Sequence, residues 1–292
     1  MVELGILFGI TTEGIFCKGF GLVNGRINLF DGLLMTRIQY LPSALQQSLQ
    51  QRCLLKVIAG LSNFDADSVE MVALAAGHGG ADLLDIACSP ELVRLAKDKS
   101  GLPICVSSVE PELFPEAVEA GASIIEIGNF DSFYPKGRFF SALEVYELTL
   151  QTRRLLPDVV LSVTIPHVLP LDQQAQLAVD LVDAGADFLQ TEGGTSARAL
   201  SSGVLGMIEK AAPTLAALTS IFEHLKKEDK MIPLLCASGL SAVTAPMAFA
   251  LGATGIGVGS AVNHLDDELA MLAVVKRLRA AILSSKSLMV SV

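Results

Sequence analysis

The chain has 292 residues, of which 51% are hydrophobic and only 18% are charged, with a formal net charge of −10. This charge argues against a broad basic surface for nucleic acid, and the lack of tryptophan with few aromatic residues removes the usual platform for stacking bases. The five cysteines form no C-x-x-C pair, which favours free thiols in a reducing compartment over a disulfide framework.

Residues 1–34 differ in composition from the remainder, being rich in Gly, Phe and Ile. Glu3 and the lack of an early Lys or Arg argue against a secretory signal peptide, which begins with basic residues. We expect an N-terminal extension at 1–40, a single domain at 41–292, and a functional protein that begins near Met35. The residues after Met35 predict a helix with Ser43 near its start.

From Leu54 onward, short apolar segments alternate with helical patterns, which predicts a parallel sheet. Helices are expected to begin behind Asp65 and Ser89 and at Pro111, because these residue types favour the first positions of a helix. One set of strands is predicted at 55–59, 104–107, 160–164 and 233–237.

The other set of strands follows one repeated template, found at 80–87, 121–128, 185–192 and 252–259. Each copy begins with Gly-Ala, and this glycine predicts the C-terminal cap of the preceding helix. Four such units, each preceded by another strand, make eight parallel strands. The fold class is therefore predicted as α/β, an eight-stranded TIM (β/α)8 barrel with an N-terminal extension.

The repeat places Asp85, Glu126, Gln190 and Gly257 at one common position, five residues after the glycine. Alternate strands of such a barrel supply one interior layer of side chains, so we expect these four residues at one level. An outward position would bury polar groups against apolar helices without partners, which favours the interior. Two carboxyl groups there raise each other's pKa unless a cation lies between them.

Lys56, near the start of the first strand, is the expected cation. A desolvated lysine beside carboxylates is a recognised base or Schiff-base nucleophile, and the alternative is a structural Lys–Glu pair. The predicted catalytic residues are Lys56, Asp85, Glu126 and Glu192.

The segment 231–263 carries no charged side chain, but its glycines and prolines divide it into pieces too short to span a membrane. Its small-residue turns follow the seventh and eighth strands, where barrels often hold phosphate on backbone N–H groups. The alternative is that the glycines only permit tight packing. The predicted phosphate-binding residues, including a further turn after the sixth strand, are Gly193, Gly194, Ser238, Gly239, Gly257, Gly259 and Ser260.

Polar residues also follow the other strands and predict the lining of a substrate site: Asn63, Ser107, Asn129, Thr164, His167 and Gln190. His167 has no second His or Cys at metal-ligand spacing, so no metal site is expected. The segment 129–138 is interpreted either as a lid over a ligand or as a solvated connector. Cys88 precedes a helix, yet a small buried hydrophobe is the favoured interpretation over a reactive thiol.

Much of the chain resembles a family of proteins from cyanobacteria and algal plastids, that of hypothetical chloroplast reading frame twenty-three. The matching segments are 56–69, 85–97, 119–134, 155–167, 189–196, 208–218, 234–248 and 257–263. The resemblance implies a TIM-type barrel located in the cytoplasm of a cyanobacterium or in the plastid stroma, and it implies no settled reaction. The sequence departs from the family at residues 1–34 and at a charged insert, 226–230, which is expected to lengthen a loop.

The motifs CASGLS and GVGSA look like the phosphate-holding loops of aldolase-type barrels, an analogy at the level of fold. The favoured hypothesis is an enzyme of isomerase, lyase or synthase type that transfers protons on a small phosphorylated metabolite. One alternative is an oxidoreductase that holds the phosphate of FMN in the same place, and another is a non-catalytic barrel that senses a metabolite or assists assembly. The cofactor is unknown, a homo-oligomer is left open, and neither a nucleic-acid nor a membrane partner is expected.

Overall fold

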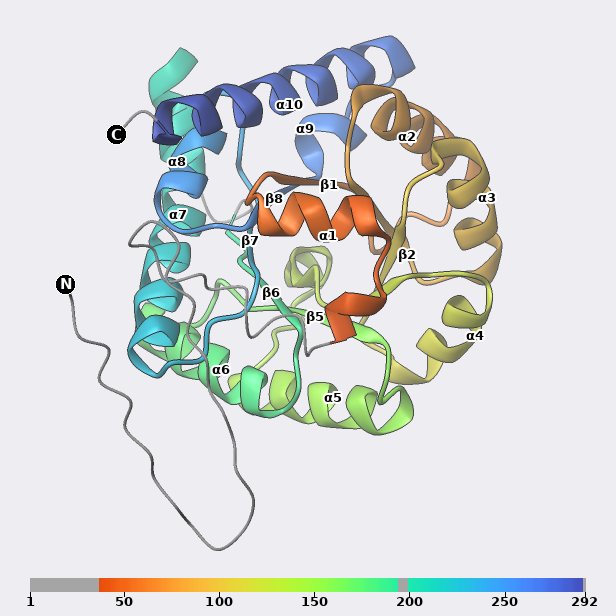
Figure 1. The fold of residues 1–292 in the computed structure, drawn as a ribbon, viewed down its shortest axis with the longest axis vertical. Coiled ribbons are helices and arrows are strands. Elements are labelled where there is room, and N and C mark those ends of the chain that lie inside the picture. Colours follow the sequence, from red (N-terminus) through yellow and green to blue (C-terminus); the bar gives the residue numbers. More distant parts are fainter. Residues whose placement is uncertain (1–36, 194–198, 291–292) are drawn as a thin grey trace, which may run out of the picture.

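The computed structural model of the protein describes residues 37–193 and 199–290. Eight parallel strands pair in chain order and close into a barrel, and helices surround it (Figure 1), which confirms the predicted TIM barrel. The strands are β1 (Leu54–Gly60), β2 (Leu83–Ala87), β3 (Ile104–Ser108), β4 (Ile124–Ile127), β5 (Val160–Thr164), β6 (Phe188–Gln190), β7 (Leu234–Ala237) and β8 (Gly255–Val258).

The outer ring of helices begins largely where the sequence predicted. The side chains of Asp65 and Ser89 cap their helices by accepting hydrogen bonds from backbone N–H groups of the first turn. Pro111 begins a 3-10 turn, η3 (Pro111–Leu113), ahead of α4. A short helix and a turn separate the final helix from β8. The helices are α2 (Ala66–Gly79), α3 (Pro90–Ser100), α4 (Phe114–Glu119), α5 (Ala142–Leu155), α6 (Leu171–Asp183), α7 (Gly203–Lys227), α8 (Ala245–Ala250), α9 (Ser260–Asn263) and α10 (Glu268–Val290).

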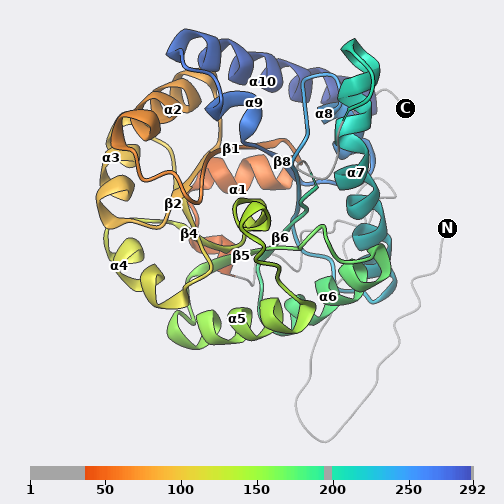
Figure 2. The ribbon, with the colours of Figure 1, turned by 180° about the vertical axis from the view of Figure 1, so that it is seen from behind.

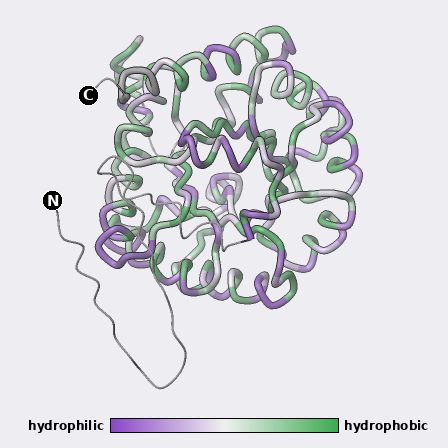
Figure 3. Tube along the Cα trace, viewed as in Figure 1, coloured by the Kyte–Doolittle hydropathy of each residue, from purple (hydrophilic) through white to green (hydrophobic). Residues whose placement is uncertain are grey.

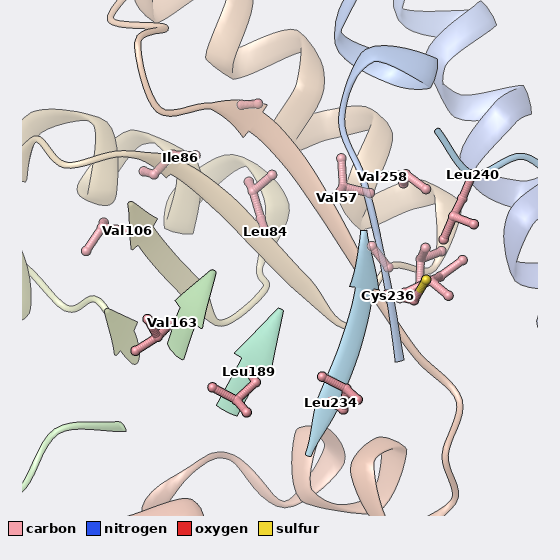
Figure 4. Close-up of a cluster of buried hydrophobic side chains, with 14 of the residues drawn as sticks. Val57, Leu84, Ile86, Val106, Val163, Leu189, Leu234, Cys236, Leu240 and Val258 are labelled. Carbon is pink, nitrogen blue, oxygen red and sulfur yellow. The ribbon is translucent and has the colours of Figure 1, made fainter. Parts of the chain in front are cut away.

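Successive side chains along each strand point alternately toward the surrounding helices and toward the barrel interior, which separates the buried residues into two cores. One set of side chains, including Val57, Leu84 and Val163, belongs to a large apolar cluster with the helices (Figure 4). The tube in Figure 3 shows hydrophilic stretches on the outer turns of the surrounding helices. The alternate residues of each strand face the barrel interior, where the layers are apolar at one end and polar higher up.

The apolar end of the interior is closed by the segment before β1. A 3-10 turn, η2 (Arg37–Tyr40), and α1 (Ser43–Gln50) lie across the barrel in Figure 1. Their buried side chains form a second core cluster with the lowest interior residues of the strands: Ile38, Leu41, Leu45, Leu49, Leu54, Leu83, Cys105, Ile124, Val160, Phe188 and Leu235. The packed structure therefore includes Arg37–Tyr40, ahead of the predicted domain boundary, whereas the predicted start near Met35 lies outside the described residues.

The glycines of the repeat adopt the conformation that their predicted capping role requires. Gly80, Gly121, Gly185 and Gly252 all have positive φ, from 82° to 112°. The left-handed region is accessible to glycine without a Cβ clash, so each helix can end sharply before the next strand. The charged insert is partly helical, because Lys226 and Lys227 form the last turn of α7 and only the following residues lengthen the loop.

Among the described residues, α7 alone is long and apolar enough to cross a membrane by length and composition. Its side chains Ala211, Leu218 and Ile221 are buried in the outer core of the barrel. This packing accounts for its apolar composition as that of a helix in the barrel wall.

Candidate functional site

A buried ion cluster occupies the interior of the barrel at the level that the repeat predicted. Lys56 Nζ lies 2.7 Å from Glu126 Oε2 and 3.1 Å from Asp85 Oδ2, and all three side chains are almost fully buried. Gln190 donates from Nε2 to Glu126 Oε1 at 2.8 Å. A Cβ added at Gly257 would come within 3.2 Å of Gln190 Oε1, so the glycine leaves space beside the amide in the same layer.

The cluster holds Lys56 in its charged form. Burial alone would lower the pKa of Lys56, but the charges of Asp85 and Glu126 outweigh it and raise the pKa above its usual range. A Schiff-base nucleophile needs a neutral amine. The geometry therefore favours an ammonium group that neutralises carboxylates over a nucleophile.

Polar side chains from β3, β5 and the loop after β4 cover this cluster. Ser107 donates its hydroxyl to Asp85 Oδ1 at 2.6 Å, and Asn129 donates from Nδ2 to Ser107 Oγ at 2.9 Å and to Asp85 Oδ2 at 3.2 Å. Thr164 donates its hydroxyl to Glu126 Oε1 at 3.4 Å. Their hydrogen bonds to the buried carboxylates hold these side chains in place. Together they form a polar layer, here called the floor, between the ion cluster and the carboxyl ends of the strands.

Above this floor lies a cavity of about 610 Å³ at the carboxyl ends of the strands. Lys56, Asp85 and Glu126 do not line it, since Asn129, Thr164 and Gln190 intervene. Predicted site residues that do line it are Asn129, Thr164, Gln190, Glu192, Ser238, Gly239, Gly257, Gly259 and Ser260. Lining residues absent from the predicted set include Asp131, Lys210, Asn263 and His264.

The turn after β7 has an unusual backbone. Ser238 and Gly239 both have positive φ, 73° and 71°, and such a conformation is uncommon for a residue other than glycine. A Cβ at Gly239 would lie 2.4 Å from the carbonyl oxygen of Lys210, so only glycine lets this turn press against α7. Strained backbone of this kind is often found at ligand-binding sites.

The predicted Gly-rich turn after β6 contributes less than expected. Gly193 does not line the cavity, and its α-carbon instead approaches α7, where an added Cβ would lie 3.0 Å from the amide nitrogen of Thr214. Gly194 lies outside the described residues. Lys210, in the third turn of α7, is a cation that the sequence prediction missed, although it lies in one of the segments quoted for the family resemblance.

A second polar cluster lies at the edge of the cavity, around Glu192. The Glu192 carboxylate accepts from the Asp131 amide at 2.9 Å and from the Tyr134 hydroxyl at 2.7 Å, and Nδ1 of His167 lies 3.1 Å from its Oε2. His167 Nδ1 is also 3.4 Å from Asp131 Oδ1. Burial raises the pKa of Glu192. Burial would lower the pKa of His167, yet its contact with Glu192 reverses the direction and raises it.

The segment 129–138 is folded over this edge of the barrel. It forms two 3-10 turns, η4 (Phe130–Ser132) and η5 (Tyr134–Lys136), visible in yellow-green at the centre of Figure 2. Phe130 is buried, and its ring centroid lies 4.5 Å from that of Phe140. The segment is thus anchored on the rim by a buried aromatic pair and by Glu192, which the solvated-connector interpretation does not account for.

The structure places three other predicted or considered residues away from the cavity lining. Asn63 donates from Nδ2 to Ser68 Oγ at 3.0 Å and so supports the start of α2. His167 contacts the Glu192 cluster and does not itself line the cavity. Burial raises the pKa of Cys88 to about 12, which leaves a protonated, unreactive thiol at neutral pH.

Within residues 37–193 and 199–290, two groups of side chains bring three possible metal ligands together within 4.8 Å: Asp85 with Cys105 and Glu126, and Asp131 with His167 and Glu192. In the first group, Lys56 already supplies the positive charge. The second group comes from three separate loops, which spacing in the sequence could not reveal.

The closed eight-stranded barrel with a polar cavity at the carboxyl ends of its strands defines a TIM barrel. Thiamine phosphate pyrophosphorylase from Pyrococcus furiosus is a solved structure of similar fold, with 17% identity and a TM-score of 0.51 over 80% of this chain and 98% of that one. (S)-3-O-geranylgeranylglyceryl phosphate synthase from Thermoplasma acidophilum, solved with sn-glycerol-1-phosphate, gives 13% identity and a TM-score of 0.56 over 83% and 99%. At these identities the similarity shows the fold alone.

Residues 41–288 match the family described as "Protein of unknown function (DUF561)", and the chain belongs to this family. The protein called ycf23, a chloroplast open reading frame, from Cyanophora paradoxa is 45% identical over 225 residues, or 77% of this chain and 90% of that protein. Its counterpart from Porphyra purpurea is 35% identical over 246 residues, 84% of this chain and 91% of that protein. These relatives indicate a plastid or cyanobacterial lineage and confirm the family resemblance.

Proposed function

We propose that the protein is an enzyme that binds a small phosphorylated metabolite in the rim cavity and carries out proton-transfer chemistry of isomerase, lyase or synthase type. The observation that supports it is the arrangement of the cavity. One cavity is lined by the turns after β7 and β8, by the cation Lys210 and by the carboxyl groups of Glu192 and Asp131. A ligand with an anionic group and a group that exchanges a proton would find partners for both in this cavity.

The anionic end is assigned to the turns that contain Ser238, Gly239, Gly259 and Ser260, with Gly257 beneath them. Backbone N–H groups in such turns bind phosphate in many barrels of this fold. A Cβ at Gly259 would meet no described heavy atom closer than 3.7 Å, so the backbone here is open enough for a ligand to approach. Lys210 would add a charge-assisted contact at the entrance.

The reacting end is assigned to the side of Glu192, because Glu192 is the predicted catalytic residue that lines the cavity. Burial raises the pKa of this carboxyl, which suits a group that exchanges a proton with a ligand. Lys56, Asp85 and Glu126 lie below the floor. Their proposed contribution is to orient Asn129, Thr164 and Gln190 beneath the ligand.

The structural neighbours support the phosphate assignment at the level of class. The printed names of several include a phosphorylated compound, among them 3-hexulose-6-phosphate synthase, which is 15% identical with a TM-score of 0.54. We place the protein in the cytoplasm of a cyanobacterium or the stroma of a plastid, in line with its lineage.

The two alternatives make different demands on the cavity. An FMN-dependent oxidoreductase would need room and partners for a flavin ring, and the described lining residues include no Phe, Tyr or Trp to stack on it. An absorbance spectrum of the purified protein distinguishes this case. A non-catalytic sensor would bind its ligand and show no turnover of any metabolite pool.

Isothermal titration with a panel of sugar phosphates and their unphosphorylated counterparts tests the proposal. We expect binding of phosphorylated compounds only, weakened about tenfold or more in Lys210→Ala, since a charge-assisted hydrogen bond contributes about 1.5–3 kcal/mol. Lys227→Ala is the matched control, because Lys227 is an exposed lysine at the opposite end of α7 and its ion pair is with the adjacent Glu228. Equal binding of phosphorylated and unphosphorylated compounds would contradict the phosphate assignment.

A further inference from the structure

We infer that Asp131, His167 and Glu192 form a binding site for a divalent first-row transition-metal ion at the edge of the cavity. The three side chains come from the loops after β4, β5 and β6, and each offers one ligand atom within 4.8 Å of the others. Glu192 and Asp131 also line the cavity, so an ion held there would face the bound metabolite, and Glu192 would then act as a ligand of the ion in place of exchanging a proton.

The spacing of the ligand atoms matches a coordination shell. Metal–nitrogen and metal–oxygen bonds of about 2.0–2.2 Å place neighbouring ligand atoms about 3.0–3.4 Å apart in octahedral or tetrahedral geometry. His167 Nδ1 lies 3.1 Å from Glu192 Oε2 and 3.4 Å from Asp131 Oδ1. The two distances from His167 Nδ1 therefore equal those between neighbouring ligands of one ion.

The chemistry of the ligand set indicates which ions it would take. One imidazole with two carboxylates suits Mn²⁺, Fe²⁺ or Zn²⁺, whereas Mg²⁺ and Ca²⁺ prefer oxygen ligands alone. With neutral His167 the set carries two negative charges, which a divalent cation balances. The buried cluster beneath has an equivalent pair of carboxylates, but there Lys56 is the cation.

Further groups hold the carboxylates in place. Tyr134 and the Asp131 amide donate to Glu192, and the Ser238 hydroxyl lies 3.3 Å from Asp131 Oδ2. Such outer partners commonly orient the ligands of a metal site. Three protein ligands leave coordination positions for water or substrate, as in catalytic sites, and an ion there would polarise an oxygen of the ligand.

Titration of the purified, chelator-treated full chain with Mn²⁺ alone tests this inference, with free Mn²⁺ followed by electron paramagnetic resonance. We expect one ion per chain, with affinity at least tenfold weaker in His167→Ala and in Asp131→Asn. His264→Ala is the matched control, because His264 lines the same cavity outside the cluster and its loss should leave the Mn²⁺ affinity unchanged.

Circular dichroism identifies any variant that fails to fold, and Asp131→Asn, which is partly exposed, is the less disruptive of the two. The inference would be overturned if the wild type bound no stoichiometric Mn²⁺ at concentrations up to about 1 mM. A dissociation constant of that size corresponds to a binding free energy of only about −4 kcal/mol. Equal affinity in His167→Ala and the wild type would also overturn the inference. Because the probe is the metal alone, this result is independent of the phosphate assignment, and Lys210→Ala should retain full Mn²⁺ binding.

Discussion

The barrel contains two polar clusters that differ in what completes them. In the interior, Lys56 lies between Asp85 and Glu126, and the group is sealed under Asn129 and Gln190. At the rim, Glu192 and its neighbours border a cavity. The comparison teaches that a cluster of charged residues inside a barrel does not by itself indicate a ligand-binding site. A buried lysine can neutralise the carboxylates without any ligand.

Removal of Lys56 tests this contrast most strongly. Lys56→Met should reduce the free energy of unfolding by about 3–5 kcal/mol, because two carboxylates are left buried without their cation. Urea denaturation followed by circular dichroism measures the loss.

A double variant provides the control for this prediction. Lys56→Met combined with Glu126→Gln should recover part of the lost stability. The second substitution removes the negative charge of Glu126, which the loss of Lys56 leaves buried without a cation. Additive destabilisation in the double variant would show that the two groups do not interact as the 2.7 Å contact indicates.

A pair of glycines compares the same two regions by size. A Cβ at Gly257, in the interior, would lie 2.9 Å from the Ala237 Cβ, whereas one at Gly259, at the rim, would meet nothing closer than 3.7 Å. We expect Gly257→Ala to destabilise the protein by about 1–3 kcal/mol through overpacking. Gly259→Ala should cost about 1 kcal/mol, through its backbone (φ −111°, ψ −90°) and not through overpacking. Thermal denaturation of both variants measures the two losses of stability. Equal losses would contradict the absence of close atoms around Gly259.

The hydrogen bond of Tyr134 measures how firmly segment 129–138 is held on the rim. Tyr134→Phe removes a donor to the buried Glu192 carboxylate and should cost about 1–3 kcal/mol, because that carboxylate loses a partner. Tyr40→Phe is the control, since Tyr40 is 76% exposed. Chemical denaturation of the two variants gives the difference, and an equal response would mean that the phenol does not hold the segment.

The smallest effect concerns Cys88. Its pKa of about 12 predicts that iodoacetamide at pH 8 leaves this thiol unmodified in the native protein. Peptide mass spectrometry after labelling reports the modification. Rapid labelling of Cys88 under native conditions would contradict the burial and revive a reactive role for this residue.

The architecture could be predicted from sequence because it depends on a repeat. The Gly-Ala template marks four helix ends and four strands, and the same count places Asp85, Glu126 and Gln190 in one layer. Local caps such as Asp65 and Ser89 were equally accessible, because their partners lie within three residues.

The rim was less accessible because its residues meet through the fold. Asp131, His167 and Glu192 are far apart in the chain and follow three different strands, so no spacing rule joins them. Lys210 reaches the cavity from a helix whose placement depends on the packing of α7 against the turn at Gly239. The repeat therefore directed the catalytic prediction to the interior, one level below the cavity.

The position of α1 limits how a ligand can enter and leave the barrel. Its buried residues Leu45 and Leu49 plug the end of the ring opposite the cavity, together with the lowest side chains of the strands. If the cavity binds a metabolite as proposed, the compound would enter and leave through the same opening at the rim, and its release would have to precede the binding of the next molecule. Attachment of a Gln47→Cys variant to a solid support through the new thiol, on the side closed by α1, would leave the cavity facing the solution.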